Sequence, residues 1–297
     1  MEQLGSFEHH SVLLKESLDL LDVKPNQDYV DGTLGLGGHS RAILERSSPE
    51  GRLLGIDHDP HALAIARQRL QPYAPRIFLQ QGNYAQVLDY LKELHWESVD
   101  GMILDLGVSS MQLDDASRGF SFLKDAPLDM RMNPEAALSA AEIVNQYSEK
   151  DLADIFYYYG EERHSRRIAR RIVESRKKSP IQKTSELAQL IASSSYGRSR
   201  IHPATRVFQA LRIAVNKELE TLENFLKHPP DFIRRGGVLV IISFHSLEDR
   251  MVKWAFRRFG EGPYEILTRK PLQAQEEEIQ KNPRARSAKL RAIKRIG

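Results

Sequence analysis

The stretch Asp31-Gly32-Thr33-Leu34-Gly35-Leu36-Gly37-Gly38 decides the fold of this chain. It follows a short segment typical of a strand, Asp28 to Asp31, and precedes a helical pattern that starts near His39. Glycines at such a strand–helix turn permit positive φ angles and let a ligand approach the backbone where a Cβ atom would clash. The sequence therefore predicts a ligand-binding loop at the carboxyl end of a strand.

An acidic residue stands where a nucleoside cofactor would need it. Asp57 ends the next predicted strand, Leu53 to Asp57, twenty positions beyond Gly37. A carboxylate at that place can accept hydrogen bonds from the hydroxyls of a ribose. The loop and the acid together therefore indicate a cofactor that contains a nucleoside.

The loop favours S-adenosylmethionine over a dinucleotide. A dinucleotide fingerprint would place a third glycine where Ser40 stands, and no basic residue lies in the loop to meet a pyrophosphate. S-adenosylmethionine needs only close backbone approach, an acid at its ribose and an apolar or aromatic slot for adenine. Gly82-Asn83-Tyr84, after the third predicted strand, supplies such a slot, with the Tyr84 ring available to pack on adenine.

Strand and helix patterns alternate over the first hundred residues, which is typical of a doubly wound α/β sheet. After Gln112 the strand signals stop, and they resume with the apolar segment Val238 to Ser243. Arg206 to Phe225 is expected to form one long helix. The further expected strands are Ile77–Leu79, Val99–Asp105, Tyr264–Leu267 and Ala288–Ile293, and an acidic loop around Glu276 to Glu278 is expected to join the last two. The further expected helices are Pro60–Leu70, Val87–Leu94, Ala140–Asn145, Glu149–Tyr158, Ser165–Arg176 and Ser185–Ser194.

Composition is that of a globular protein that works without thiols. The 297 residues are 41% hydrophobic and 28% charged, and none is Cys, which excludes disulfides, zinc ribbons, iron–sulfur ligation and a thiol nucleophile. Val238 to Ile242 is the longest apolar run and cannot span a membrane. Met1 to His10 carries no secretory signal pattern, so we expect a cytoplasmic protein.

Positive charge is concentrated in two segments. Arg163 to Lys178 holds eight basic residues and one acid, and Pro283 to Gly297 holds six basic residues and no acid. Such segregation indicates a polyanionic partner such as RNA, although each run could also be a solvated helix face. The aromatic run Phe156 to Tyr159 could stack on a base or fill a core. The candidate phosphate contacts are Arg163, Arg166, Arg167, Arg170, Arg171, Arg284 and Arg286.

Several motifs together resemble one family along nearly the whole chain. They are His10-Ser11-Val12-Leu13-Leu14, the glycine loop through Ser40, Leu104 to Ser110, Arg118 to Phe122, Pro127 to Met132, Tyr159 to Arg163, His202 to Arg206, Ser243 to Arg250 and Asn282 to Ser287. The chain resembles the RsmH (MraW) family, bacterial methyltransferases that modify the N4 atom of a cytosine in small-subunit ribosomal RNA.

The resemblance implies a fold, a reaction and a partner. The fold is a class I, Rossmann-like methyltransferase sheet with an inserted all-helical domain, which places the methyltransferase domain at residues 1–112 and 206–297 and the helical, RNA-recognition insertion at 113–205. The reaction is methylation of the exocyclic N4 of one cytidine in the decoding region of 16S rRNA, in the small subunit or an assembly intermediate. The cofactor is S-adenosylmethionine, and its implied contacts are Gly37, Gly38, His39, Asp57, Tyr84, Asp105 and Gln112.

An exocyclic amine needs no covalent intermediate, which agrees with a chain that lacks Cys. Catalysis then consists of positioning, with an acceptor for the amine hydrogens. Asp105, at the end of the fourth predicted strand, can serve the cofactor, the amine or both. His245 follows the fifth strand and either positions the target base or belongs to a helix cap made by Ser246. The histidine spacing does not match the helical zinc motif, so no metal is expected.

Two other functions use the same features. A nicotinamide-dependent oxidoreductase would use the strand–glycine–acid unit, and a non-catalytic RNA-binding protein of ribosome assembly would use the basic segments. The missing third glycine argues against the first alternative, and the intact Gly37, Asp57 and Asp105 argue against the second. The sequence leaves the oligomeric state open.

Overall fold

The computed structural model describes residues 11–193 and 202–297, and the chain divides into two compact units. The first comprises Met1–Gly107 and Glu220–Gly297, and the second is Val108–Leu219. These boundaries differ from the 113 and 205 expected from the sequence. The later boundary moves because α10 (Ala204–Asn216) buries Val207, Phe208 and Leu211 in the core of the second unit.

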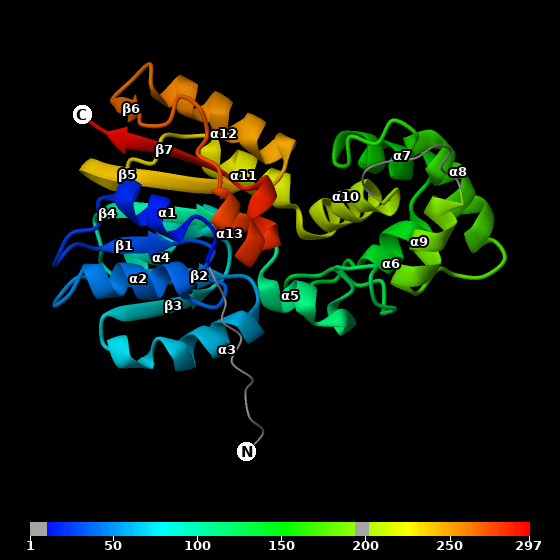
Figure 1. The fold of residues 1–297 in the computed structure, drawn as a ribbon, viewed down its shortest axis with the longest axis horizontal. Coiled ribbons are helices and arrows are strands. Elements are labelled where there is room, and N and C mark those ends of the chain that lie inside the picture. Colours follow the sequence, from blue (N-terminus) through cyan, green and yellow to red (C-terminus); the bar gives the residue numbers. More distant parts are fainter. Residues whose placement is uncertain (1–10, 194–201) are drawn as a thin grey trace. The chain divides into compact units, whose positions relative to one another are not determined.

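A seven-stranded sheet forms the first unit. Its order is β3-β2-β1-β4-β5-β7-β6, and the labels in Figure 1 follow that order from β3 at the bottom to β6 at the top. The five strands from β3 to β5 are parallel, whereas β7 is antiparallel to both of its neighbours. The strands are β1 (Tyr29–Asp31), β2 (Leu53–Asp57), β3 (Ile77–Gln81), β4 (Val99–Asp105), β5 (Ile233–Ser243), β6 (Tyr264–Ile266) and β7 (Lys289–Arg295). The doubly wound α/β fold expected from the sequence is confirmed.

Helices cover both faces of this sheet. Because side chains alternate along a strand, Met102 and Leu104 of β4 enter one apolar core while Ile103 enters the other. The core around Ile103 is closed by α1 (Leu14–Leu21), α2 (Gly38–Arg46) and α3 (Pro60–Arg69). The opposite core is closed by α4 (Val87–Glu93), the later part of α11 (Glu218–Leu226) and α12 (Ser246–Phe259).

The second unit is helical in its described residues. Its helices pack around one core that contains Phe156, Ile172 and Leu211, and the helices expected within 140–192 are confirmed. Ser194, the expected end of one of them, lies outside the described residues. The helices are α5 (Ser110–Asp114), α6 (Ala140–Gln146), α7 (Glu149–Tyr158), α8 (Ser165–Arg176), α9 (Thr184–Ala192) and α10.

The prediction of a single long helix over Arg206 to Phe225 is wrong, because the helix is interrupted at Lys217, between α10 and α11. Lys217 takes the left-handed conformation there, with φ 51°. The Arg212 guanidinium bridges the break with two hydrogen bonds to Glu218, at 2.8 and 2.9 Å. Tertiary contacts therefore override a helical periodicity that continues through the break.

Two helices of the first unit lie where none was expected. They are α1 and α13 (Glu276–Lys281), and the second stands where the acidic run suggested a loop. Within residues 11–193 and 202–297, every helix is too short or too polar to cross a membrane.

Candidate active site

The glycine loop follows β1 at the carboxyl edge of the sheet. Gly35 and Gly37 have φ angles of 51° and 80°, a region that favours glycine. A Cβ atom on Gly37 would come within 3.0 Å of the Leu70 side chain, so space also demands glycine there. A Cβ atom on Gly35 would meet nothing nearer than the Thr33 carbonyl oxygen at 3.9 Å. The backbone at Gly35 is therefore open to a ligand.

Asp57, at the end of β2, braces this loop. Its Oδ2 accepts a hydrogen bond from the Gly35 N–H at 2.7 Å, and its Oδ1 accepts one from the Asp59 N–H at 2.8 Å. Burial raises the pKa of Asp57 to about 6, although these two hydrogen bonds oppose the shift. Each carboxylate oxygen keeps a second lone pair. The residue can thus hold the loop and still accept a ribose hydroxyl.

Ser40 has a structural reason to replace the third glycine. Its hydroxyl donates a 2.7 Å hydrogen bond to Oδ2 of Asp31, and both side chains are buried. Oδ1 of Asp31 accepts the Thr33 N–H at 3.2 Å. Burial raises the pKa of Asp31 to about 6, and the charge of Asp57 adds to this. The buried Asp31 at the end of β1 thus holds the first turn of α2 through its hydrogen bond from Ser40.

Asp105 ends β4, next to the glycine loop. Its N–H donates a 2.6 Å hydrogen bond to Oγ1 of Thr33, so the Thr33 hydroxyl joins the glycine loop to the end of β4. The side chain is 25% exposed, but its Oδ1 is buried and has no hydrogen-bond partner among the described residues. Burial raises the pKa of Asp105 well above its usual range, and the nearby carboxylates of Asp31, Glu248 and Glu278 raise it further.

His39 connects the N-terminal segment to this acid. It is 6% exposed, with Nε2 at 3.1 Å from the Val12 carbonyl oxygen and Nδ1 at 3.8 Å from Oδ2 of Asp105. The adjacent Leu13 N–H donates a 2.7 Å hydrogen bond to Glu278 of α13. Sequence reasoning missed Glu278, because its only signal was an acidic run taken for a loop.

His245 is the N-cap of α12, so the expectation that Ser246 caps this helix is wrong. Nδ1 of His245 accepts the Glu248 N–H at 3.4 Å, and Nε2 lies 3.2 Å from Oε1 of Glu248. The other oxygen of Glu248 accepts the Phe244 N–H at 2.9 Å. Nδ1 therefore caps the first turn of α12, at the edge that also holds Asp105, whereas the buried Nε2 lies near the Glu248 carboxylate without a hydrogen bond to any described residue. Positioning of a base by His245 stays a prediction.

Two of the implied cofactor contacts have other roles here. Tyr84 is 7% exposed in the apolar core, edge-to-face against Phe225 at 5.6 Å between ring centroids. Gln112 belongs to the second unit, where its Oε1 accepts the Ser109 N–H at 3.0 Å in a capping box that starts α5. Contact of either residue with a cofactor stays a prediction.

The basic helix α8 has structural and exposed arginines. Arg176 donates 2.6 Å hydrogen bonds to the carbonyl oxygens of Val144 and Tyr147, and Arg171 donates to Ser193. The exposed arginines are Arg163, Arg166 and Arg170, of which Arg170 lies 3.5 Å from Glu149, while Arg167 is half-buried.

The aromatic run Phe156 to Tyr159 likewise contains both buried and exposed side chains. Phe156 is completely buried and Tyr159 half-buried, as a core requires. Tyr157 and Tyr158 are 55% and 63% exposed and lie edge-to-face at 5.2 Å.

The C-terminal basic run is mostly built into the sheet. Arg291 donates a 2.7 Å hydrogen bond to Asp249 of α12, and Arg295 donates to three backbone oxygens, those of Asp231, Ile233 and Gly297. Of the two candidate phosphate contacts, Arg286 is exposed and Arg284 is half-buried.

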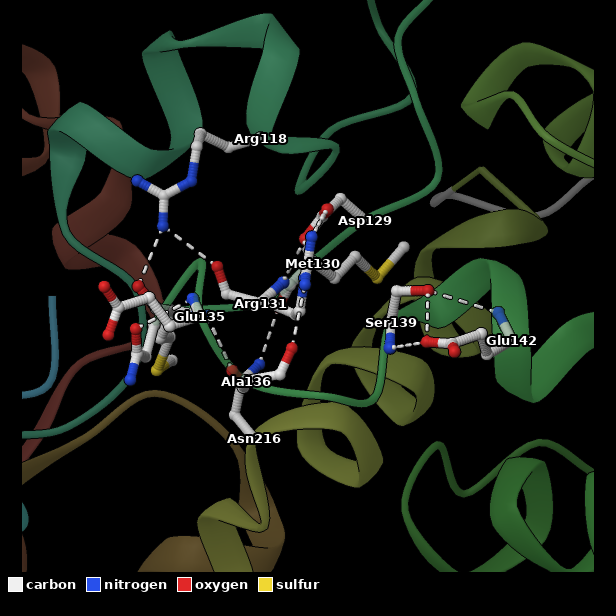
Figure 2. A network of polar contacts seen from close by, with 11 residues as sticks. Arg118, Asp129, Met130, Arg131, Glu135, Ala136, Ser139, Glu142 and Asn216 are labelled. Atoms are coloured by element: carbon white, nitrogen blue, oxygen red, sulfur yellow. Dashed lines mark hydrogen bonds and ion pairs between the residues drawn. The ribbon is translucent and has the colours of Figure 1, made fainter.

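A polar network fixes one of the motif loops in the second unit, as Figure 2 shows. The Asn216 amide donates to the Met130 carbonyl oxygen and accepts the Met132 N–H, at 2.8 and 2.7 Å. Arg131 forms a bidentate ion pair with Asp129. Arg118 donates to the carbonyl oxygens of Arg131 and Met132. The loop is thereby held although Met130 has a φ of 63°.

The fold and the site define a class. A parallel sheet extended by an antiparallel β7, a glycine loop after β1 and an acid at the end of β2 are the features of a class I, S-adenosylmethionine-dependent methyltransferase.

Comparison with known proteins identifies the family. The profile of the MraW methylase family matches residues 6–296, and the chain belongs to this family. It is 53% identical to the ribosomal RNA small subunit methyltransferase H of Cyanothece sp., over 98% of this chain and 95% of that protein. The protein of the same name from Syntrophobacter fumaroxidans is 48% identical, over 100% and 99%. The solved structure of an rRNA methylase from Streptococcus thermophilus has a TM-score of 0.45 and 14% identity, covering 97% of this chain and 99% of that one. A methylase of this family uses S-adenosylmethionine as its cofactor, so membership of the family contradicts the oxidoreductase alternative.

Proposed function

We propose that this chain transfers a methyl group from S-adenosylmethionine to the exocyclic N4 of a cytidine in the decoding region of 16S rRNA. Membership of the MraW methylase family supports methyl transfer, and the names of the relatives support small-subunit ribosomal RNA as the substrate. The absence of Cys supports an amine target, because methylation at C5 of a pyrimidine usually requires a thiolate.

The residues at the carboxyl edge of the sheet fit the cofactor. The open backbone at Gly35 and the tight turn at Gly37 and Gly38 would receive its methionine part, and Asp57 would accept its ribose hydroxyls. The carboxylates of Asp31, Glu248 and Glu278 lie near Asp105, and this concentration of acids would favour the positive charge of the cofactor. When bound, the cofactor supplies an electrophilic methyl group on a sulfonium.

The observation that carries the reaction is the buried Oδ1 of Asp105, which has no hydrogen-bond partner within the described ranges. A buried acceptor without a donor is costly and fits a site that awaits a ligand. We assign this oxygen to an N–H of the target amine. A hydrogen bond there would orient the nitrogen lone pair toward the methyl group and favour a pyramidal nitrogen. His245 and Glu248 hold α12 at the same edge.

The second unit would contribute RNA binding. Arg163, Arg166 and Arg170 lie exposed in and before α8, and Tyr157 and Tyr158 present exposed rings at the end of α7. Arginines that bind phosphates and rings that stack on bases are the usual combination for single-stranded RNA.

The test is methyl transfer to small subunits from cells that lack this activity. The protein is incubated with them and labelled S-adenosylmethionine, and the modified nucleoside is identified by mass spectrometry. We expect N4-methylcytidine at one site. Asp105→Asn should lower kcat while cofactor affinity, measured by calorimetry, stays within about threefold of wild type.

Each other outcome has a definite meaning. Label on another atom would contradict the N4 assignment and keep the cofactor. Cofactor binding without transfer to naked rRNA, intermediates or finished subunits would favour the non-catalytic assembly protein. An Asp105→Asn variant that loses cofactor affinity instead of kcat would move Asp105 from the amine to the cofactor.

The contribution of α8 is tested by charge removal. Arg166→Ala with Arg170→Ala should weaken RNA binding and reduce the slope of log affinity against log salt by about 0.7 for each lost phosphate contact. Arg176→Ala is the matched control, because that arginine is used on backbone carbonyls of α6 and the residue after it. It should lower the free energy of unfolding and leave the salt slope unchanged.

A further inference from the structure

The outer face of α12 has an unusual composition. Its four exposed residues are Arg250, Trp254, Arg257 and Arg258. The acids of the helix, Glu248 and Asp249, are turned inward, where Glu248 accepts the Phe244 N–H and Asp249 pairs with Arg291. The exposed positions of α12 are therefore all basic or aromatic.

Trp254 is the centre of this face. It is 61% exposed, and the Arg257 guanidinium lies over its ring at 5.2 Å from the centroid. An indole rarely stays exposed without a partner, because burying it removes a large apolar surface from water. The other tryptophan, Trp96, shows the usual arrangement: it is 6% exposed and packs edge-to-face on Phe78.

The position of α12 relates this face to the site within the first unit. The helix begins at Ser246, beside the His245 cap and at the edge that holds Asp105. At a rise of about 1.5 Å per residue, Arg250 lies about 6 Å and Trp254 about 12 Å further along the helix axis. An RNA whose target base reaches this edge of the sheet would therefore have its neighbouring nucleotides beside the exposed face of α12.

We infer that the exposed face of α12, Arg250, Trp254 and Arg257, binds the single-stranded RNA next to the target nucleotide, with one base stacked on Trp254. The inference rests on the proposed RNA substrate and adds a contact that the basic segments of the sequence did not include. The charge of the face decides the occupant. The face exposes arginines and no acid, so RNA offers phosphates to the guanidinium groups of Arg250 and Arg257 and a base to the ring, whereas an apolar protein partner offers no countercharge. Arg258 already donates to the carbonyl oxygens of Leu226 and Lys227 and is left out of the proposed contact.

Tryptophan emission of the full-length protein tests the contact. The probe is a twelve-nucleotide single-stranded RNA with a central cytidine, and the spectrum of Trp254→Phe gives the contribution of Trp96 alone. We expect saturable quenching in the wild type and none in Trp254→Phe. Trp254→Ala should weaken RNA binding about 5- to 150-fold, the range for loss of one stacked base. Arg257→Ala should reduce the salt slope by about 0.7.

Leu88→Ala is the matched control, because Leu88 is a large apolar side chain of the same unit with 52% exposure. It should leave RNA affinity unchanged. Urea denaturation of each variant checks that the fold is intact. Absence of quenching, or a Trp254→Ala affinity equal to that of Leu88→Ala, would overturn the inference. Quenching by intact small subunits but not by naked RNA would overturn it in favour of a ribosomal protein.

Methyl transfer separates this inference from the proposed function. With small subunits as substrate, Trp254→Ala should raise KM and leave kcat near the wild-type value, because the ring contacts RNA away from the reacting atoms. If the wild type stacks RNA on Trp254 but makes no N4-methylcytidine, the proposed reaction fails and the RNA contact stands. If it makes N4-methylcytidine without quenching, only the α12 contact fails.

Discussion

At the scale of single residues, the site depends on carboxylates that are taken out of water. Asp57 was expected from its spacing to the glycine loop, and it does lie at the end of β2, bonded to the loop. Its hydrogen bonds to two backbone N–H groups could not be predicted, because they depend on the exact path of the turn. The same holds for Asp31 and Thr33, whose contacts to Ser40 and to the Asp105 N–H join residues of different elements.

Asp57→Ala should weaken S-adenosylmethionine binding about 10- to 150-fold, because a hydrogen bond to a charged group contributes about 1.5–3 kcal/mol. The variant also removes the acceptor of the Gly35 N–H, so the loop loses its brace. Isothermal titration calorimetry measures the affinity. Asp57→Asn is the matched control: it keeps one acceptor oxygen and should lose less. Unchanged affinity in Asp57→Ala would remove Asp57 from the site.

The free energy of unfolding of the cofactor-free protein should carry a pH dependence from Asp31. Because its pKa is about 6 in the folded protein and about 4 when unfolded, the folded state holds its proton more tightly. The contribution of Asp31 is therefore present below about pH 4 and lost as the pH rises to about 6, at a cost on the order of 3 kcal/mol. Asp31→Asn should remove that loss.

Urea denaturation at several pH values measures this difference between wild type and variant. Asp19→Asn should change the pH dependence of the free energy of unfolding in the opposite direction, because the Lys15 hydrogen bond lowers the pKa of the exposed Asp19. That bond stabilises the protein above the ordinary pKa of the carboxyl and is lost as the pH falls. An Asp31→Asn curve parallel to the wild type would show that Asp31 is not the group that titrates.

At the scale of elements, the hydrophobic periodicity located most helices. It failed where a side chain forms hydrogen bonds to a distant segment of the chain. The pattern from Arg206 to Phe225 continues through Lys217, yet the chain turns there. Asn216, just before the turn, uses its amide to hold the Met130–Met132 loop (Figure 2). Local propensity contains no information about such a partner, which lies 84 or more positions away in the sequence.

Lys217→Gly should stabilise the protein by about 0.5–1 kcal/mol. Lys217 has φ 51°, where an L-residue with a Cβ atom costs about 1–2 kcal/mol, and glycine recovers part of that after its larger loss of chain entropy. The measurement is the free energy of unfolding in urea. Lys217→Ala removes the same charge and keeps the Cβ atom, so it should give no such gain; equal effects of the two variants would contradict the backbone explanation.

At the scale of the whole molecule, two units with separate cores should unfold in two transitions. The glycine loop, Asp57 and Asp105 belong to the first unit, so S-adenosylmethionine should raise only that transition. Both tryptophans also belong to it, so their emission follows its unfolding while circular dichroism follows the helices of both units. One coincident transition in both signals, shifted as a whole by the cofactor, would show that the units unfold together.

The sequence by itself determined the sheet, the glycine loop, the acids at strand ends and the family, because these depend on local patterns and on motifs of fixed spacing. The tertiary structure alone decided what each of those residues touches. In it, the Ser40 hydroxyl donates a hydrogen bond to Asp31, Tyr84 packs in the core against Phe225, and Trp254 is exposed among arginines. The physical reason is that burial, desolvation and pairing arise between segments far apart in the chain, and periodicity along one segment does not record them.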